Sequence, residues 1–442
     1  MHNPNYRQKL VYILFNLILG FILFYMPFLS TYFGLAIIIL ATYMILSQPD
    51  HNGMFPLIFS SYIVGIEVLL RMCESTLFWE FGKYAVIYFI LLGFIRRKSI
   101  INIHLPLLCY FLFLLPSIIN LPMDSLNIWR QNVAFNLAGP ACLTILTFYL
   151  YNMRINRNEL MNILFFSFLP IISMSIVIIL KMPDIQSYHF MPYSDPLTSG
   201  GYGPNQVSTI FGFIISGVFI GQLSKKYISG SKYVDLLSLV LFIGLGLITF
   251  SRGGLFAAII SIVIAFSFYF YRDYRKLYFF FQTLIILIIS TITWYTVVSI
   301  TDGAISKRYG LIGGTYGERL VLDLTGRAQI YKIDLDIFSD YLLTGCGPGQ
   351  AYNLRQNYGY GKVVAAHTEF SRMLAEHGIL GLLSLILLLG IPIYYYFSSE
   401  PPNSKIIKIL FGTLALLTMF HSAMRIAMPC FAYSLIIPKY DD

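Results

Sequence analysis

Long apolar runs constrain the fold of this chain more than any other feature of its sequence. A helix that crosses a bilayer needs about 20 predominantly apolar residues, and runs near that length recur along the 442 residues. The strongest are 10–28, 32–46, 160–180, 236–250, 255–271 and 277–298. Weaker candidates are 54–72, 81–95, 105–121, 133–150, 207–223, 374–397 and 406–420. We therefore predict an all-α polytopic membrane protein with about twelve to fourteen transmembrane helices, and the C-terminal apolar stretch stays undecided.

The composition agrees with this fold class and leaves room for no soluble domain beyond one loop. Apolar residues make up 57% of the chain and charged residues 12%, whereas roughly a quarter of the residues in a soluble globular protein are charged. The five cysteines are scattered without metal-ligand spacing. We expect free thiols and no metal site, although a bridge between Cys73 and Cys346 in outer loops stays open. The first apolar run lacks a small-residue cleavage site and is expected to be a retained anchor.

The formal charge of +9 is better explained by membrane topology than by nucleic acid. Basic residues gather in the turns between alternate apolar runs, which is the pattern of cytoplasmic loops. These turns contain Arg7 and Lys9; Arg96, Arg97 and Lys98; Arg154 and Arg157; Lys225, Lys226 and Lys232; and Arg272, Arg275 and Lys276. We therefore predict a multi-pass membrane protein with a cytoplasmic N-terminus, surrounded by membrane lipids and without a nucleic-acid partner.

The basic residues on the opposite side or within spans are mostly arginines. A guanidinium offers a planar fork of donors that suits phosphate oxygens, and charge near a bilayer is costly to keep. As a set they indicate an anionic ligand at the outer face, although each one alone could instead meet lipid headgroups or a local acid. They are Arg71, Arg130, Arg252, Arg308, Arg319, Arg327, Arg355, Arg372 and Arg425.

The loops divide the chain into three parts. Residues 1–298 hold transmembrane helices with short loops, residues 299–371 form one long periplasmic loop that contains the active-site region, and residues 372–442 hold the C-terminal transmembrane helices. Within the long loop, residues 327–343 place apolar side chains at helical spacing. These are Ile330, Ile333, Ile337, Phe338 and Tyr341. We expect an amphipathic helix that lies at the membrane surface.

The end of the long loop contains a candidate catalytic residue, His367. Thr368 is expected to cap the helix that follows, because its hydroxyl can accept a hydrogen bond from a first-turn amide. A helix N-terminus attracts phosphate and favours a neutral imidazole, and a neutral imidazole can act as a base. The alternative is a histidine that caps the helix or contacts headgroups. His377, inside the helix, is expected to have a packing role, and His189 is a lone loop histidine.

Several motifs of this chain resemble those of one bacterial family. His367-Thr368 is followed after nine residues by Gly378-Ile379-Leu380-Gly381. Upstream lie Ser251-Arg252-Gly253-Gly254, then Gly326-Arg327 before the loop helix, and the turn Gly345-Cys346-Gly347-Pro348-Gly349. In order and spacing these resemble O-antigen ligases and the related O-antigen polymerases over roughly the C-terminal half. Gly203-Pro204-Asn205 and Arg130 are weaker matches, and threonine at position 368 departs slightly from the commonest ligase pattern.

The resemblance implies a membrane glycosyltransferase with a GT-C-like fold. Such an enzyme takes a glycan from undecaprenyl diphosphate at the periplasmic face, without nucleotide sugar, metal or another cofactor. Arg252 and Arg327 resemble the arginines that engage the donor diphosphate, and His367 resembles the catalytic histidine. The topology argument adds further diphosphate-binding candidates, which are Arg71, Arg130, Arg308, Arg319 and Arg372.

The acceptor and the reaction class leave alternatives open. The acceptor is lipid A-core in a ligase and a lipid-linked glycan in a polymerase, and transfer to protein would use the same donor chemistry. A flippase or other transporter of lipid-linked glycans, and a noncatalytic scaffold, are the alternatives from other classes. Asp334-Leu335-Asp336 has the form of a metal-binding motif, but two helical residues two apart point in different directions, so we expect a coincidence.

Overall fold

The computed structural model describes residues 4–50, 52–97, 102–122, 125–184, 187–272, 276–309, 327–361, 366, 368–398 and 400–441. Within these ranges, the side chains of residues 268–272, 276–283, 285, 286 and 327 are not described. The regular structure of the described residues is helical apart from two strands of three residues. The predicted all-α class is therefore confirmed.

Eight of the described helices are long and apolar enough to cross a membrane, and the chain is a multi-pass membrane protein. They are α1 (Tyr6–Tyr25), α2 (Leu29–Ser47), α3 (Phe55–Met72), α6 (Leu126–Leu150), α7 (Arg157–Lys181), α8 (Pro204–Ser224), α15 (Glu369–Phe397) and α16 (Pro402–Ser422). The other apolar runs form α4 (Phe81–Arg97), α5 (Leu105–Leu114), α9 (Lys232–Ile248), α10 (Arg252–Arg272) and α11 (Lys276–Ile300).

The smaller elements lie between and after these helices. They are the 3-10 helices η1 (Pro116–Asn120) and η2 (Pro196–Ser199), the short helices α12 (Ala304–Arg308), α13 (Arg327–Asp340), α14 (Ala351–Asn357) and α17 (Met428–Ser434), and the strands β1 (Arg154–Asn156) and β2 (Lys439–Asp441).

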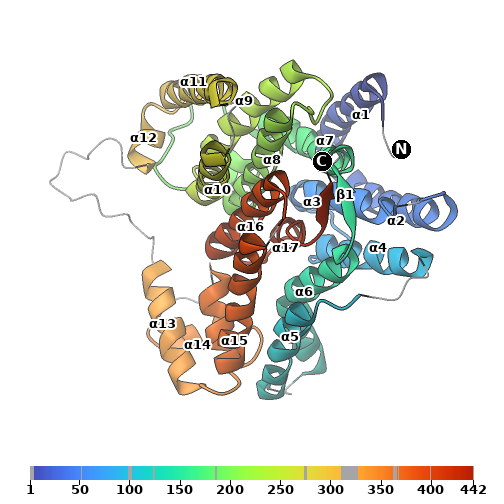
Figure 1. Ribbon diagram of the computed structural model, residues 1–442. Coiled ribbons are helices and arrows are strands. Elements are labelled where there is room, and N and C mark those ends of the chain that lie inside the picture. The colour runs from blue at the N-terminus through green and yellow to red at the C-terminus, as the bar shows by residue number, and fades with distance from the viewer. Residues whose placement is uncertain are drawn as a thin grey trace.

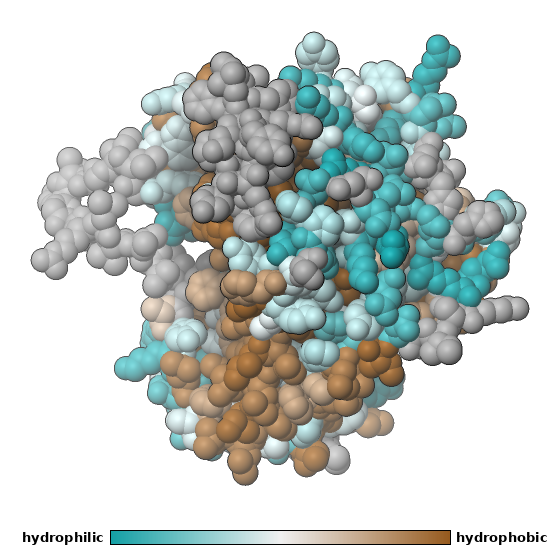
Figure 2. All heavy atoms as spheres, in the orientation of Figure 1, coloured by the Kyte–Doolittle hydropathy of each residue, from teal (hydrophilic) through white to brown (hydrophobic). Residues whose placement is uncertain are grey.

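Central and peripheral helices differ in what covers their apolar side chains. Nearly every residue of α3 is buried, because α3 packs against α7, α4 and α2. Similarly, α10 packs against both α8 and α16, and α15 against α5 and α16 (Figure 1). By contrast, α1 and α2 leave large apolar side chains such as Leu14 and Ile39 exposed. In Figure 2 the lower part of the molecule is brown where Figure 1 places α15 and α5, and Ile386 and Ile393 of α15 are exposed. Lipid is the natural solvent for such surfaces.

The basic turns predicted to share one side of the membrane do lie together in the described residues. Lys9 donates to the Ile228 carbonyl at 2.7 Å, and Lys226 donates to Asn158 Oδ1 at 2.8 Å. These two bonds join the start of α1, the α8–α9 turn and the start of α7. The residues therefore mark one end of the bundle, here called the basic end. Lys98 and Arg275 of the predicted turns lie outside the described residues.

The C-terminal apolar stretch returns through the protein instead of forming another long helix. After α16 the chain runs through the short helix α17, and β2 then pairs in parallel with β1 at the basic end (Figure 1). Every residue of α17 is buried, and the helix packs against α16 and α6. Irregular backbone at membrane depth is tolerated only where protein or a water-filled cavity surrounds it. The C-terminal apolar stretch, which the apolar pattern alone left undecided, is therefore buried within the helix bundle and forms no further long helix.

The amphipathic helix of the long loop forms as α13, and part of its apolar face packs against protein. Ile330, Ile333 and Ile337 are buried, and α13 packs against α15 and α14. Lys332 and Asp336 are exposed on the opposite side. The periodicity therefore predicted the helix and the buried positions Ile330, Ile333 and Ile337 correctly, while Tyr341 of the same predicted set is exposed. The position of α13 at the membrane surface stays a prediction.

All five cysteines are free in the structure. Cys73 and Cys346 are each buried in separate surroundings, so the disulfide left open by the sequence is not formed.

Candidate functional site

A cavity of about 300 Å³ opens where α15, α6 and the segment after α16 meet. Four basic residues line it, and only two acidic ones do. The charged lining residues are Lys83, Arg355, Arg372, Arg425, Glu369 and Glu376. The others are Asn132, Phe135, Asn136, Gly349, Tyr352, Ala366, Ala423 and Met424. We call this space the cationic cavity, because its lining has an excess of positive charge and favours an anionic ligand.

Helix α15 brings one basic and two acidic side chains to the cavity. The helix begins after Thr368, whose hydroxyl accepts a hydrogen bond from the Phe370 amide at 3.2 Å, so the predicted cap is confirmed. Arg372 forms ion pairs with Glu369 and, at 2.8 Å, with Glu376. It is only 9% exposed. Because the three residues are about one turn apart, they face one another, and their pairing offsets the cost of burying charge.

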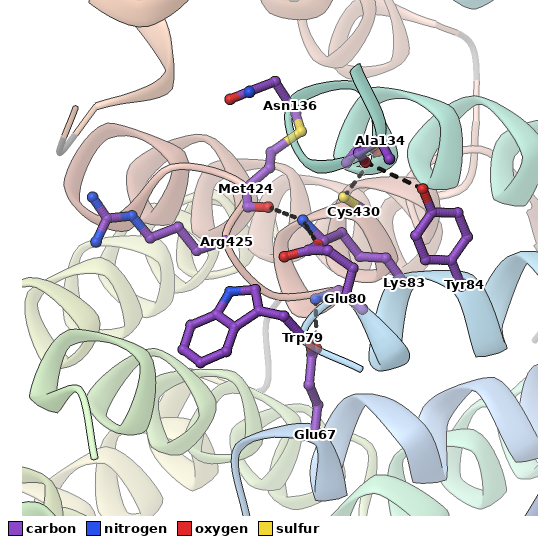
Figure 3. Close-up of polar contacts among 12 residues, drawn as sticks. Glu67, Trp79, Glu80, Lys83, Tyr84, Ala134, Asn136, Met424, Arg425 and Cys430 are labelled. Atoms are coloured by element: carbon purple, nitrogen blue, oxygen red, sulfur yellow. Dashed lines mark hydrogen bonds and ion pairs between the residues drawn. The ribbon is translucent and has the colours of Figure 1, made fainter. Parts of the chain in front are cut away.

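The turn after α16 is held by charged side chains. The Met424 carbonyl accepts a hydrogen bond from Lys83 at 3.0 Å, and the Met424 amide donates to Glu369 at 3.3 Å. The Arg425 carbonyl accepts from Arg71 Nη1 at 3.2 Å. In Figure 3, Lys83 reaches the Met424 carbonyl with Glu80 beside it, while the Arg425 side chain extends away from both. Backbone groups that leave a helix in an apolar setting need such partners.

Arg71, which the topology argument assigned to a phosphate, is occupied by protein groups. Its guanidinium forms an ion pair with Glu67 at 2.7 Å, donates to Gln206 Oε1 at 3.0 Å, and lies 5.1 Å from the centre of the Trp79 ring. Glu67 in turn accepts the Ala427 amide at 2.8 Å. Since Arg71 is only 4% exposed, this geometry favours a role in fixing the turn after α16.

Arg425 connects that turn to the end of the long loop. Its Nη2 atom donates to the Ala366 carbonyl at 2.6 Å, and both residues line the cationic cavity. Ala366 precedes His367, which itself lies outside the described residues. Because Glu369 also lines the cavity, the chain contacts it on both sides of His367.

A second buried ion pair attaches the loop helices to α15. Asp334 and Arg355 pair at 2.7 Å, and the Ser371 hydroxyl donates to Asp334 at 2.6 Å. Burial raises the pKa of the Asp334 carboxyl, while the Arg355 guanidinium and the Ser371 hydroxyl oppose that rise. Asp334 is fully buried whereas Asp336 is exposed. The two aspartates thus do not share a face, as the sequence predicted.

Glycines let the turn that follows α13 approach α15 closely. Gly345, Gly347 and Gly349 all have positive φ angles, which suit glycine. Gly378 interrupts α15 with φ 61° and ψ −141°, and a Cβ atom there would lie 2.6 Å from the Leu342 carbonyl oxygen. The predicted tight turn therefore fits against a kink in α15, six residues beyond Arg372.

A separate pair of arginines lies at the start of α10. Arg252 Nη1 donates to the Arg308 carbonyl at 3.0 Å, and Arg308 Nε donates to the Phe250 carbonyl at 3.2 Å. Ser251 donates to Asn205 Oδ1 at 2.8 Å. The predicted start of a helix at Ser251-Arg252 is confirmed, since α10 begins at Arg252.

The start of α8 lies between the two arginine groups. Asn205 contacts Ser251 of the α10 group, and the next residue, Gln206, contacts Arg71 beside the turn after α16. The weakly matched segment Gly203-Pro204-Asn205 therefore lies between Arg252 and Arg71, two of the predicted phosphate-binding residues.

The other predicted site residues either lie outside the cavity lining or are not described. Arg130 is exposed on α6, two residues before Asn132 of the cavity lining. Arg327 begins α13, but its side chain is not described. Arg319, like His367, lies outside the described residues. The structure thus brings Arg372 to the cationic cavity and sets Arg252 and Arg308 apart from its lining.

Two further histidines, His377 and His189, are a packing residue and a loop residue. His377 is fully buried, and its Nδ1 atom lies 2.7 Å from the Ser117 hydroxyl and 3.0 Å from the Leu114 carbonyl. The predicted packing role is therefore confirmed. His189 is exposed in the loop between α7 and η2.

Sequence reasoning did not select three basic residues of the cavity. Arg355 and Arg425 belong to the predicted set of outer arginines but were not predicted to bind the diphosphate. No role was predicted for Lys83. The spacing of Glu80 and Lys83, three residues apart at the start of an apolar helix, was an available signal of an ion pair. Glu369 and Glu376 carried the same signal around Arg372.

Among the described residues, no group of three or more histidine, cysteine, aspartate or glutamate side chains is arranged to hold a metal ion. His367 and residues 310–326 are not among the described residues, so the absence of a metal group does not extend to them.

Two comparisons with known proteins bear on this site. A family model described as O-antigen ligase matches residues 237–386. That range includes α10 with Arg252, the loop helices, and the start of α15 with Arg372. No curated protein matches the chain.

Proposed function

We propose that the chain, which matches a family model described as O-antigen ligase over residues 237–386, moves an O-antigen-type glycan from undecaprenyl diphosphate to an acceptor sugar. The observation that supports the proposal is the cationic cavity, because half of its lining residues come from the matched region. These are Gly349, Tyr352, Arg355, Ala366, Glu369, Arg372 and Glu376. We place the reaction at the periplasmic face of the bacterial inner membrane, with the N-terminus in the cytoplasm.

The transfer requires a base and a stabilised leaving group. The acceptor hydroxyl loses its proton, its oxygen bonds to C1 of the donor sugar, and the C1–O bond to the diphosphate breaks with the electron pair going to the diphosphate. We assign His367 to the acceptor hydroxyl, as base or as orienting group. We assign Arg425, which lines the cationic cavity, and Arg327 to the negative charge that grows on the diphosphate, because guanidinium forks bind phosphate oxygens bidentately. Arg252 lies apart from that lining and stays a donor-binding candidate through the family resemblance alone.

The acceptor separates two versions of this function. Lipid A-core is the acceptor of a ligase, and a second lipid-linked glycan is the acceptor of a polymerase. Deletion of the gene distinguishes them. Loss of a ligase leaves lipopolysaccharide without O-antigen while lipid-linked polymer accumulates, whereas loss of a polymerase leaves single repeat units. Ligation is the version that we propose, with polymerisation as the alternative that the deletion decides.

Transfer by the purified full-length chain in proteoliposomes tests the proposal directly. The unaltered protein should form a new glycosidic bond from a lipid-linked donor, and addition of EDTA should leave the rate unchanged. His367→Ala should abolish transfer, and Arg327→Lys should impair it despite the retained charge, because the fork is lost. Arg154→Lys at the basic end is the matched control. Movement of the donor across the membrane without a new bond would identify a transporter and contradict the proposal.

The sidedness of the long loop provides an independent test. A cysteine placed at the exposed position Tyr352 should react with a membrane-impermeant thiol reagent added to intact spheroplasts. Reaction only after the membrane is broken would place the loop in the cytoplasm, where no periplasmic donor is available.

A further inference from the structure

A second cavity, of about 640 Å³, lies on the other side of α14 from the cationic cavity. The segment 349–355 lies between the two cavities and lines both of them with different residues. Gly349 and Arg355 line the cationic cavity, whereas their neighbours Gln350 and Leu354 line the second. Both volumes fall within the roughly 300–1,000 Å³ range of pockets that bind small ligands. We call the second space the neutral cleft.

The charge of the neutral cleft differs from that of the cationic cavity. Asp340 is the only residue of its described lining with a formal charge at neutral pH, and no lysine or arginine lines it. A phosphate or diphosphate would find no counter-charge there and would be repelled by the carboxylate. The ligand class that fits the cleft is therefore uncharged.

The polar groups of the cleft suit a ligand with many hydroxyls. Asn120 uses its amide nitrogen to donate to the Thr344 hydroxyl and the Gly345 carbonyl, both at 2.7 Å. Its amide oxygen accepts no hydrogen bond within the described structure. The Gln350 side chain likewise forms no hydrogen bond to described residues. A carboxylate, Asp340, adds strong acceptor oxygens, so donors and acceptors converge on one space.

An aromatic ring completes the lining. Tyr341 is 42% exposed and lines the cleft beside Leu343. Sugar rings present hydroxyls at their edges and apolar C–H groups on their faces, so a ring beside amides and a carboxylate can contact both kinds of surface. Tyr358 donates a hydrogen bond to Asp340, and that bond is the main cause that raises the pKa of Tyr358 to about 12. The phenol therefore stays protonated and keeps the carboxylate in place.

We propose that the neutral cleft binds the uncharged sugar portion of the acceptor glycan, while the cationic cavity takes the charged portion of the donor. This inference rests on the proposed glycosyl transfer and adds where the acceptor binds. The acceptor glycan then extends from the neutral cleft past α14, so that its reacting hydroxyl lies beside His367 and the donor at the cationic cavity.

Binding measured apart from turnover tests the cleft. Two lipid-free probes are offered to the full-length protein in nanodiscs, namely a dephosphorylated core oligosaccharide and a single O-antigen repeat unit. Saturation-transfer NMR and calorimetry report whether each binds. Tyr341→Ala should weaken binding of one probe about tenfold, which corresponds to an aromatic contact of about 1.4 kcal/mol. Tyr341→Phe, which retains the ring, should bind within about twofold of the unaltered protein.

Tyr331 provides the matched control. It is also 42% exposed, lies on α13 and does not line the cleft, so Tyr331→Ala should leave binding unchanged. Gln350→Leu is the second cleft variant, with similar size and no hydrogen-bonding group. In the transfer assay both cleft variants should raise the KM for the acceptor and leave the KM for the donor unchanged.

The outcomes separate the cleft from the proposed function. Equal binding by Tyr341→Ala and Tyr331→Ala, or a change confined to the donor KM, overturns the cleft assignment while transfer stands. Tyr341-dependent binding of a probe by a protein that makes no glycosidic bond supports the cleft and contradicts the proposed function. If Tyr341→Ala lost co-purified phospholipid and still bound the glycan probes normally, the cleft would be a lipid site, and its assignment to glycan would be overturned.

Discussion

The two ends of the bundle carry positive charge in physically different ways. At the basic end, Arg154 and Asp441 lie 3.9 Å apart with side chains 73% and 51% exposed. At the opposite end, Arg372 and Glu376 pair at 2.8 Å with side chains 10% and 3% exposed. Water screens the first pair, whereas the second is held by a network of protein groups. The topology explains why exposed basic residues occur at the basic end. The buried charged residues at the opposite end must instead serve the chemistry or the packing of the site.

The largest expected effect comes from breaking a buried pair. Arg71→Met should lower the free energy of unfolding by about 3–5 kcal/mol, because Glu67 is left buried without its partner. Arg154→Met at the basic end should cost less than about 1 kcal/mol. Unfolding of both variants in mixed micelles measures the difference. Equal effects would show that the two ends do not differ as described.

The halves of α15 should respond differently to the same small substitution. Gly381→Ala places a Cβ against the Met373 carbonyl, where the helix is kinked, and should cost about 1–3 kcal/mol from overpacking. Gly390→Ala, nearer the basic end, meets nothing within 4 Å and should be neutral or stabilising by up to about 1 kcal/mol. Thermal denaturation of the two variants compares them. Similar midpoints would argue against close packing at the kink.

Arginine forks at the two ends should differ in their effect on activity. Arg425→Lys should lower kcat about tenfold to a hundredfold with little change in stability. Lysine has no planar guanidinium, so it cannot hold the Ala366 carbonyl and bind the donor diphosphate bidentately at the same time. Arg97→Lys is the control, since Arg97 also donates to a backbone carbonyl, that of Asn52, at the basic end. The transfer assay with saturating donor measures both. A normal rate in Arg425→Lys would remove Arg425 from the site.

The smallest effect is expected at Arg130. It is exposed and makes no hydrogen bond or ion pair within the described residues, so Arg130→Ala should change the free energy of unfolding by less than about 0.5 kcal/mol. Donor binding in nanodiscs sharpens the comparison, because a weakened affinity without a change in stability would assign Arg130 to the ligand.

The sequence predicted the fold class and the grouping of the basic turns at one end of the bundle, because apolar length and charge bias are local properties of the chain. It did not predict the partners of the buried charged residues. The Ala427 amide and Glu67 lie 360 positions apart, and no periodicity reveals such a contact.

The start of one helix near the site was missed, for a related reason. The apolar run predicted a span from residue 133, whereas α6 begins at Leu126. The additional turns contain polar residues such as Asn127 and Arg130, so low hydropathy marks them as loop. The start of α15 was predicted although its apolar run begins only at residue 374, because the cap at Thr368 is a local signal.

The pairing of β2 with β1 has a consequence for biosynthesis. Residues 423–441 leave the ribosome after the helices that they bridge, since synthesis runs from the N-terminus. Until this segment inserts, Glu67, Arg71 and Lys83 lack the backbone groups that satisfy them. A nascent or truncated chain is therefore unfinished at the candidate site although its eight long apolar helices are present, because the charges of Glu67, Arg71 and Lys83 still lack these partners.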